Sequence, residues 1–408
     1  MIIGKVARNT FFLSVSQVAS RLIGFLYFIF LARILGVRGF GVYTFTTAFI
    51  YNFVPVADFG VERLVMRDIS RQPKEARYYL SRLLPLRVFL AIFAFVLAVI
   101  LGLVLHQPWK QILYLAIFGL ALVPYNLTLL FASFLNSREK MGYLAGANIG
   151  LVLLTAFFGI TFGYLERGLS YILLAYPLAN LLILGVFLIN GKSWGVPFGW
   201  IIDWQFWKKS LSQSWVFAFF LIVAVFYLRL TTILVNLIKG PEATGFYSSA
   251  FKFVEAMILI PQSLALALFP LSSKLMVENK GQLRGVYGKG LAVLFLASLP
   301  FSLGLIFGAN LIIKFSYGVN YLAARPVLAV LGVGLIFFFV NALAGNVIQN
   351  SKEVRKFLPF AIVNFLITLF FALILIPRYS IVGAAWAVVG GEIFGLIINN
   401  YFVLKVLK

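Results

Sequence analysis

The stretch that decides the fold is NTFFLSVSQVASRLIGFLYFIFLA, residues 9–32. It is long enough to cross a bilayer, because about 20 helical residues rising about 1.5 Å each span roughly 30 Å of hydrocarbon. Its single charge, Arg21, costs about 2.5 to 3.5 kcal/mol at mid-membrane depth, so it persists only beside a partner, a cavity or a bound solute. The pattern recurs at Arg229 and Lys252. Three such cations predict a polar path for an anionic solute.

The composition excludes an ordinary soluble domain. Of the 408 residues, 62% are hydrophobic and only 11% are charged, which indicates a chain that crosses the membrane many times. Twelve apolar stretches are centred near Ile23, Ile50, Ala94, Leu122, Leu153, Leu178, Val223, Leu259, Ala297, Phe337, Leu366 and Phe394. We therefore predict an all-α polytopic membrane protein with twelve transmembrane helices.

Lysine and arginine are distributed unevenly between the loops. One alternate set of loops, which includes both termini, carries 23 of the 34 cations, and the other set carries 8. Cytoplasmic loops are enriched in Lys and Arg, so both termini are predicted to be cytoplasmic. The net charge of +22 then reflects topology and attraction to anionic membrane lipids. A nucleic-acid partner is the competing interpretation, and the scatter of cations over short membrane loops argues against it.

A repeated motif divides the chain into halves. The pattern G-x4-G-x-Y occurs at residues 36–43 and again at 240–247, 204 residues later. Pro55 and Pro261 break the matching spans and are predicted hinges. Because each half holds six spans, the halves enter the membrane in the same direction, with a pseudo-two-fold axis along the membrane normal.

This repeat predicts three domains. Residues 1–190 form an N-terminal six-helix lobe, 191–213 a cytoplasmic interfacial linker, and 214–408 a C-terminal six-helix lobe. The seam between the lobes carries five of the seven tryptophans, namely Trp194, Trp200, Trp204, Trp207 and Trp215. Tryptophan favours the headgroup layer, so an aromatic belt is the preferred interpretation of this cluster.

Polar residues recur at helical spacing on several spans. The stripes comprise Ser14, Gln17, Arg21 and Gly24 in the first span, Thr44, Thr47, Tyr51 and Asp58 in the second, and Ser248, Lys252, Glu255 and Gln262 in the eighth. The seventh span adds Arg229 and Asn236, and the twelfth adds Glu392. Matching stripes on repeated helices predict two polar walls facing a central cavity.

Each of these residues also has a structural interpretation. Interhelical hydrogen bonding explains Ser, Thr and Asn well, at about 0.6 to 2 kcal/mol per contact. A guanidinium has five donors and is hard to bury as a structural contact, so Arg21 and Arg229 favour a solute. Lys252 and Glu255 are three residues apart on one helix, where an ion pair and a solute contact are equally good interpretations.

Several motifs resemble a known family. They are N-T-x-F at residues 9–12, A-R-x-L-G-x3-F-G-x-Y at 32–43, and a basic loop after D-x-G at 58–60. These are similar to polysaccharide-biosynthesis (Wzx-type) flippases of the superfamily that also holds MATE drug exporters and lipid II flippases. The resemblance covers the whole chain in length, span count and half-repeat. Twelve spans, where lipid II flippases have fourteen, favour the oligosaccharide branch.

The resemblance implies a function in the plasma membrane of a prokaryote. The family moves polyprenyl-pyrophosphate-linked oligosaccharide from the cytoplasmic to the outer leaflet through a central cationic cavity. We expect Arg21, Arg229 and Lys252 to bind phosphate, and Gln17, Tyr51 and Asn236 to contribute to the binding of the same substrate. Rocking of the lobes would alternate access, with polysaccharide polymerase machinery as a further partner.

No cofactor or metal is expected, and coupling to a proton or sodium ion stays open. The acids that could bind such an ion are Asp58, Glu255 and Glu392. The chain has no cysteine, which excludes thiolate ligands and disulfides.

Two other functions are alternatives to a flippase. A MATE-like exporter of organic cations would favour an acidic cavity, and three cations against three acids within spans do not decide the sign. A membrane glycosyltransferase or polymerase would need catalytic carboxylates or metal ligands on large outer loops. Those loops hold only Glu166 and Glu242, and His106 is the sole histidine. We therefore expect a transporter and no enzyme.

Overall fold

The computed structural model describes residues 2–407 except 139, 197 and 352, and the side chains of 2–14, which include the N-T-x-F motif, lie outside the described part. Helices make up almost all of this part, and no strand occurs in it. By packing, the chain forms two compact units. Unit 1 comprises Met1–Ile34 and Thr46–Phe226, and unit 2 comprises Leu35–Phe45 and Tyr227–Lys408. The predicted lobe and linker bounds stay predictions.

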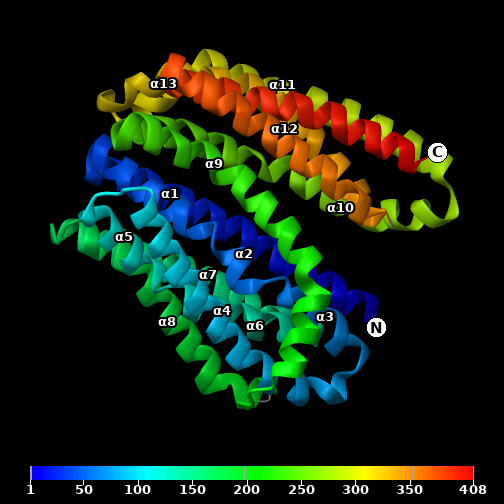
Figure 1. The fold of residues 1–408 in the computed structure, drawn as a ribbon. Coiled ribbons are helices and arrows are strands. Elements are labelled where there is room, and N and C mark those ends of the chain that lie inside the picture. Colours follow the sequence, from blue (N-terminus) through cyan, green and yellow to red (C-terminus); the bar gives the residue numbers. More distant parts are fainter. Residues whose placement is uncertain (1, 139, 197, 352, 408) are drawn as a thin grey trace. The chain divides into compact units, whose positions relative to one another are not determined.

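Unit 1 is built around α6 (Figure 1). Its elements are most of α1 (Ile2–Tyr51), α2 (Val54–Asp58), α3 (Val61–Arg71), the 3-10 helix η1 (Pro73–Glu75), α4 (Ala76–Val104), α5 (Trp109–Gly119), α6 (Leu122–Ser137), α7 (Met141–Tyr164), α8 (Leu169–Trp194) and the first half of α9 (Trp204–Met257). Helix α6 packs against α3, α4 and α8. Phe131 and Phe134 of α6 lie fully buried in the core that these helices share.

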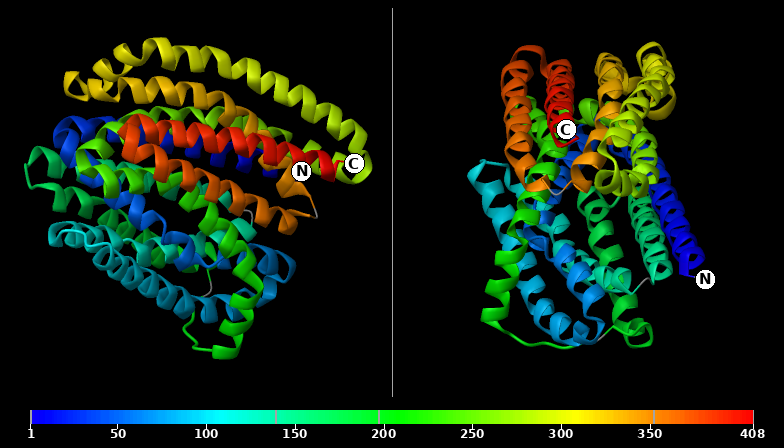
Figure 2. Two further views of the ribbon diagram at one scale, coloured as in Figure 1. Left: turned by 45° about the horizontal axis from the view of Figure 1, so that its top comes forward. Right: turned by 90° about the vertical axis from the view of Figure 1, so that its right-hand side faces the viewer.

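Unit 2 is built around α12, which packs against α10, α11 and α13 (Figure 2). Its elements are the second half of α9, α10 (Leu259–Glu278), α11 (Lys280–Tyr317), the 3-10 helix η2 (Val319–Ala324), α12 (Arg325–Asn350) and α13 (Val354–Val406), together with residues 35–45 of α1. Helices α10, α11 and α13 each pack one face against α12 and carry exposed apolar side chains elsewhere, as in a membrane bundle.

Three helices are far too long for one membrane crossing, and each is broken inside. Helices α1, α9 and α13 have 50, 54 and 53 residues. The breaks lie at Gly36, Gly240 and Ser380, whose φ angles are 63°, 83° and 52°. A positive φ interrupts the helical hydrogen-bond ladder and is readily adopted by glycine. Each long helix therefore consists of two segments joined at one residue.

The repeated G-x4-G-x-Y motif makes a reciprocal contact within unit 2. A side chain at Gly41 would overlap the carbonyl oxygen of Pro241, and one at Gly245 would overlap the carbonyl oxygen of Val37. Position 241 is the 204-residue image of 37, and 245 is the image of 41, so each contact is the image of the other. The first glycine of the motif breaks the helix, and the second allows two backbones to touch. The predicted repeat is thereby confirmed at this contact.

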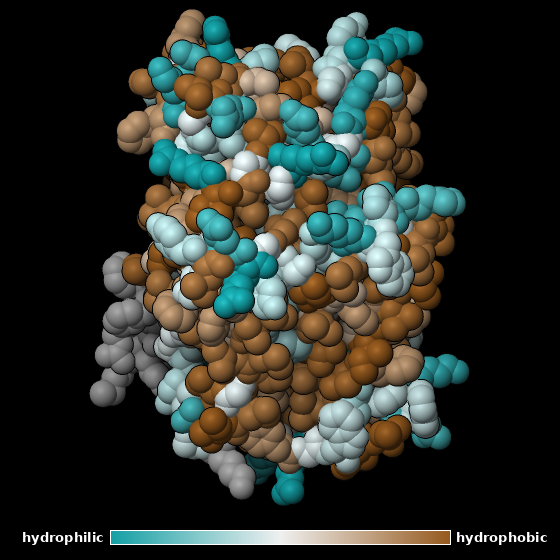
Figure 3. All heavy atoms as spheres, turned by 90° about the vertical axis from the view of Figure 1, so that its left-hand side faces the viewer, coloured by the Kyte–Doolittle hydropathy of each residue, from teal (hydrophilic) through white to brown (hydrophobic). Residues whose placement is uncertain are grey.

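Nine helical runs in the described part of the chain are long and apolar enough to span a membrane. They contain all twelve predicted span centres, because the runs Val15–Arg71, Trp204–Phe269 and Lys356–Val406 hold two centres each. Apolar side chains cover much of the surface in Figure 3, as expected of a surface in contact with lipid. The all-α polytopic class is confirmed, and the count of twelve and the central cavity stay predictions.

Pro55 and Pro261 both lie in the first turn of a new helix. Pro55 is the second residue of the short α2. Pro261 is the third residue of α10, which Ile258 separates from the end of α9 at Met257. Proline is tolerated there because the first-turn N–H groups have no intrahelical partner. A hinge role for either residue stays a prediction.

Candidate functional site

Arg21 and Gln17 lie on the first half of α1 with exposed side chains. Tyr51 ends the same helix inside an aromatic cluster of unit 1, with ring centroids 6.0 Å from Phe118 and 5.9 Å from Tyr176. The two groups are about 30 residues apart on α1. Their predicted shared role in binding a solute stays a prediction.

Arg229, Lys252 and Glu255 form a charged cluster across the break in α9. Glu255 accepts from Arg229 through one oxygen and from Lys252 through the other, both at 2.9 Å. The three side chains keep 34%, 25% and 23% of their surface exposed. One carboxylate holds two cations, so the cluster retains one surplus positive charge. The ion pair that the sequence allowed for Lys252 and Glu255 is confirmed.

Asn236 lies two helical turns beyond Arg229 on α9 and is half-buried. It falls in the same apolar segment as the cluster but lies closer to the break at Gly240. Its predicted role in substrate binding stays a prediction.

Glu392 is the centre of a second polar cluster in unit 2. It is buried, and its carboxylate accepts from the Tyr227 hydroxyl at 2.7 Å and from Asn341 Nδ2 at 2.8 Å. Asn341 Oδ1 in turn accepts from Asn399 Nδ2 at 3.2 Å. Both side chains that donate to Glu392 in the described part of the chain are neutral. Among these described residues, the carboxylate therefore has hydrogen bonds but no fixed counter-ion.

A cavity of about 520 Å³ adjoins this cluster within unit 2. Glu392 and Asn341 supply polar groups to its wall, and Leu228, Phe269 and Phe338 supply apolar ones. Concave sites with a few convergent polar groups on an apolar wall are typical of small-ligand sites. The cavity gives the buried carboxylate a route to a ligand or ion.

Asp58 has the opposite environment in unit 1. Its Oδ1 lies 2.5 Å from Arg87 Nη2, and its Oδ2 accepts from the Gly60 N–H at 3.0 Å. Arg87 also donates to Asn126 Oδ1 at 3.3 Å and has no exposed side-chain surface. A fixed cation already neutralises Asp58. Its predicted ion-coupling role stays a prediction.

The 23 cations assigned above to the cytoplasmic loops include Arg87, and this assignment was wrong. Arg87 lies inside α4 in the core of unit 1. The sequence does indicate a position inside a helix, because apolar residues flank Arg87 on both sides, as they flank Arg21. Tyr227 and Asn341, each a lone polar group in an apolar run, were also not predicted as site residues. A single tyrosine or asparagine in an apolar run does not indicate a functional site until its hydrogen-bond partner is known.

Of the linker tryptophans, Trp207 is buried in unit 1 and donates to the carbonyl of Arg82 at 2.8 Å. Trp200, Trp204 and Trp215 keep 61%, 68% and 53% of their surface exposed. An interfacial belt therefore fits the exposed three and does not fit Trp207.

Comparison with known proteins identifies a family and several relatives to which the chain is similar. The model of the family described as "Polysaccharide biosynthesis protein" matches residues 6–276. A "Putative O-antigen transporter" of Shigella flexneri is 24% identical over 88% of both chains. A "Probable low-salt glycan biosynthesis flippase" of Haloferax volcanii is 23% identical over 94% of this chain and 80% of the relative.

Solved structures share the fold. The lipid II flippase MurJ in an inward closed conformation superposes with a TM-score of 0.75 at 16% identity, covering 97% of this chain and 88% of that one. An inward-facing multidrug resistance MATE family transporter of the MOP superfamily superposes at 0.73 with 13% identity, covering 95% of each chain. The protein thus has the fold of multi-pass membrane transporters, and it belongs to the polysaccharide biosynthesis protein family.

Proposed function

We propose that this protein is a flippase that moves a polyprenyl-(pyro)phosphate-linked oligosaccharide from the cytoplasmic to the outer leaflet by alternating access. Family membership supports the proposal, together with relatives named as an O-antigen transporter and a glycan biosynthesis flippase. The observation that carries it is the cluster on α9, where one carboxylate holds two cations.

The chemistry of the cargo fits this cluster. A pyrophosphate-linked sugar cannot cross hydrocarbon, because an isolated ion there costs tens of kcal/mol. Glu255 fixes the positions of Arg229 and Lys252 without cancelling their combined charge. Guanidinium and ammonium groups held in place form strong charge-assisted bonds with phosphate oxygens. Arg21 and Gln17 on α1 would add contacts, with Tyr51 and Asn236 as further polar groups for sugar.

Glu392 is the best candidate for coupling to a proton or sodium ion. Its partners Tyr227 and Asn341 are neutral, and it lines a cavity. A buried carboxylate without a counter-ion is costly, so binding a mobile cation stabilises it. In this proposal, Glu255 stays with its two cations and Asp58 stays with Arg87.

The location follows from charge and family. The excess of Lys and Arg in the loops on one side supports cytoplasmic termini, and the proposed cargo supports a location in the plasma membrane of a prokaryote. Anionic lipids would surround the basic face. The product in the outer leaflet would be passed to polysaccharide polymerase machinery.

The decisive experiment follows translocation of a fluorescent polyprenyl-pyrophosphate oligosaccharide in proteoliposomes. Arg229→Gln leaves Glu255 paired with Lys252, so folding should be retained. Translocation should fall about 10-fold to 150-fold, since a hydrogen bond to a charged group contributes about 1.5 to 3 kcal/mol. Arg21→Ala should also slow it.

The matched control is Arg325→Gln, which removes an exposed arginine at the start of α12. It should translocate at the wild-type rate. Wild-type rates in both Arg229→Gln and Arg21→Ala, with normal insertion, would show that the cationic cluster does not bind the cargo.

One observation favours a second candidate, a MATE-like exporter of organic cations. The cavity beside Glu392 joins a carboxylate to Phe269 and Phe338, a combination that suits an aromatic cation. Rhodamine 6G binding to the purified protein tests it. Retention that is lost in Glu392→Gln supports the exporter, and no retention excludes it.

A further inference from the structure

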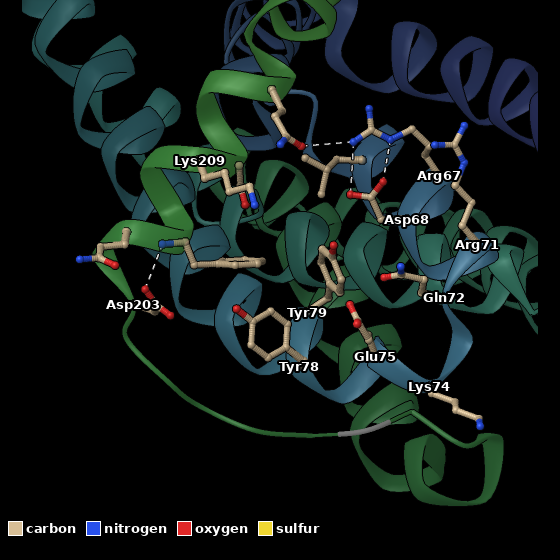
Figure 4. A pocket seen from close by; sticks show the side chains of 15 residues that line it. Arg67, Asp68, Arg71, Gln72, Lys74, Glu75, Tyr78, Tyr79, Asp203 and Lys209 are labelled. Atoms are coloured by element: carbon tan, nitrogen blue, oxygen red, sulfur yellow. Dashed lines mark hydrogen bonds and ion pairs between the residues drawn. The ribbon is translucent and has the colours of Figure 1, made fainter.

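A cup of about 830 Å³ opens in unit 1 and shares no lining residue with the α9 cluster of unit 2. The end of α3, η1 and the first turns of α4 form one side, and the first turns of α9 form the other (Figure 4). Figure 4 shows Tyr78 and Tyr79 between the wall with Arg67 and Arg71 and the wall with Lys209. The cup lies entirely within one unit, so its shape is independent of the other unit.

Two of the acids around the cup are already engaged. Asp68 pairs with its neighbour Arg67 at 2.6 Å. Asp203 accepts from the Phe206 N–H and from Arg82 Nε, both at 2.9 Å. The Phe206 N–H first, and then the Arg82 guanidinium, lower the pKa of the Asp203 carboxyl, which stays ionised and committed to these donors.

The remaining charges leave the cup positive. Arg71, Lys74 and Lys209 line it, and none of them takes part in an ion pair with the side chains that the structure describes. Glu75 is the remaining carboxylate of the lining. Three cations against one acid leave a surplus of two positive charges. Such a concave, like-signed surface concentrates anions.

The floor of the cup is aromatic and hydroxylated. Tyr78, Tyr79 and Phe206 pack edge to face in a triad with centroids 5.6 to 5.8 Å apart. The Arg82 guanidinium lies 3.8 Å from the centroid of the Tyr78 ring and fixes that ring in place. The amides of Gln72, Gln205 and Gln213 line the walls. Tyrosine and amide groups of this kind hydrogen-bond hydroxylated ligands.

The surroundings place the cup at the membrane surface. The segment before α9 is tied to α4 by the Ile201 N–H, which donates to the Ser81 carbonyl at 2.9 Å. Trp200, Ile202 and Trp204 of this segment are 58% to 68% exposed. Exposed tryptophan beside basic residues is typical of the headgroup layer. A ligand of the cup would therefore reach it from the surface of the bilayer.

We infer that this cup is a binding site for the phosphate-ester headgroup of a membrane lipid. Arg71, Lys74 and Lys209 bind the phosphate, and the tyrosines and glutamines contact the hydroxyls of the attached glycerol or sugar. The same chemistry comes from two sources, a resident anionic phospholipid or the head of a lipid-linked sugar before transport. The inference concerns binding at a separate site and does not depend on the α9 cluster.

The test uses the full-length protein in phosphatidylcholine nanodiscs. One arm adds a fluorescent phosphatidylglycerol, and the other adds a fluorescent polyprenyl-pyrophosphate sugar. The variant is Arg71→Gln, Lys74→Gln and Lys209→Gln together. Each cation near an anionic headgroup contributes about 1 kcal/mol, so the triple variant should bind its lipid about 100-fold more weakly.

A matched control removes one arginine and two lysines elsewhere. Arg284→Gln, Lys289→Gln and Lys405→Gln together change the charge equally, at exposed positions of unit 2. This control should bind as wild type. Loss in the phosphatidylglycerol arm alone identifies a resident lipid, and loss in the sugar arm alone identifies the cargo. Equal losses in variant and control, or no loss in either arm, would overturn the inference.

A second variant covers the case in which the triple variant fails to fold. Glu75→Gln removes the opposing carboxylate and keeps all three cations. It should strengthen binding about fivefold, on the same scale of about 1 kcal/mol per charge. Unchanged or weaker binding in Glu75→Gln would contradict the assigned charge balance.

Discussion

Unit 1 and unit 2 each bury a carboxylate, but they stabilise it in different ways. Asp58 lies against the fully buried guanidinium of Arg87. Glu392 is held by the hydroxyl of Tyr227 and the amide of Asn341, and no cation among the described side chains pairs with it. In a fixed ion pair the two charges neutralise each other. A carboxylate among neutral donors keeps its negative charge and can still bind a mobile cation. The difference separates a structural acid from a candidate coupling acid.

The largest expected effect comes from removing the fixed cation. Arg87→Met should destabilise the protein by about 3 to 5 kcal/mol, because it leaves Asp58 buried and unpaired. Thermal unfolding in detergent measures the loss. Adding Asp58→Asn should restore part of it.

The control is Arg67→Met, which breaks an ion pair at a side chain 43% exposed. Exposed pairs contribute about 0 to 1 kcal/mol. If Arg87→Met and Arg67→Met unfold alike, the Asp58 pair is not a structural element.

In unit 2, Tyr227→Phe removes one neutral donor from Glu392. A hydrogen bond to a charged group contributes about 1.5 to 3 kcal/mol, so unfolding should occur earlier by that amount. The exposed Tyr379→Phe serves as the control. If Tyr227→Phe costs as much in a Glu392→Gln background as in wild type, the two side chains are not coupled.

Glu392→Gln tests the other half of the comparison. Tyr227 and Asn341 donate to different oxygens of Glu392. Glutamine can accept from Asn341 through its one amide oxygen and donate through its NH2 group to the Tyr227 hydroxyl oxygen, so stability should change by less than about 1 kcal/mol. The response of translocation to an imposed proton or sodium gradient should fall about 5-fold to 150-fold, the usual range of a coupling free energy. Glu278→Gln is a control at an exposed carboxylate. An unchanged gradient response would remove Glu392 from the coupling mechanism.

The smallest effect is expected at Asp203, a partly exposed carboxylate that serves as the reference for the two buried ones. Phe206 N–H and Arg82 lower the pKa of Asp203, so its stabilising contribution is present above the unfolded pKa of about 3.9. It is lost as the pH falls through the lowered folded value. Unfolding curves between pH 5 and pH 2 should show this loss in wild type and not in Asp203→Asn. Identical pH profiles would contradict it.

Local patterns predicted some of the site correctly. Lys252 and Glu255 are three residues apart on one helix, so helical geometry alone brings them together. Arg229 joins the same carboxylate from before the break at Gly240. That third partner was not predictable, because it depends on how the two segments of α9 fold against each other.

The charged core of unit 1 was predicted poorly for the same reason. Arg87 and Asp58 lie on different helices, and Arg87 also meets Asn126, 39 residues away. The apolar residues on both sides of Arg87 indicate that it lies inside a helix, but they do not indicate its partners. Only the packing of α2, α4 and α6 brings Asp58 and Asn126 to it.

The sequence by itself determined that the chain is helical and crosses a membrane, because apolar runs of this length must satisfy their backbone internally. It also determined the repeat, since a helix break and a close backbone contact each require glycine at Gly36 and Gly41 and at their images. Tertiary structure decided which buried acids are neutralised. Tyr227 reaches Glu392 across 165 residues, and the state of a buried charge depends on the groups that packing places beside it.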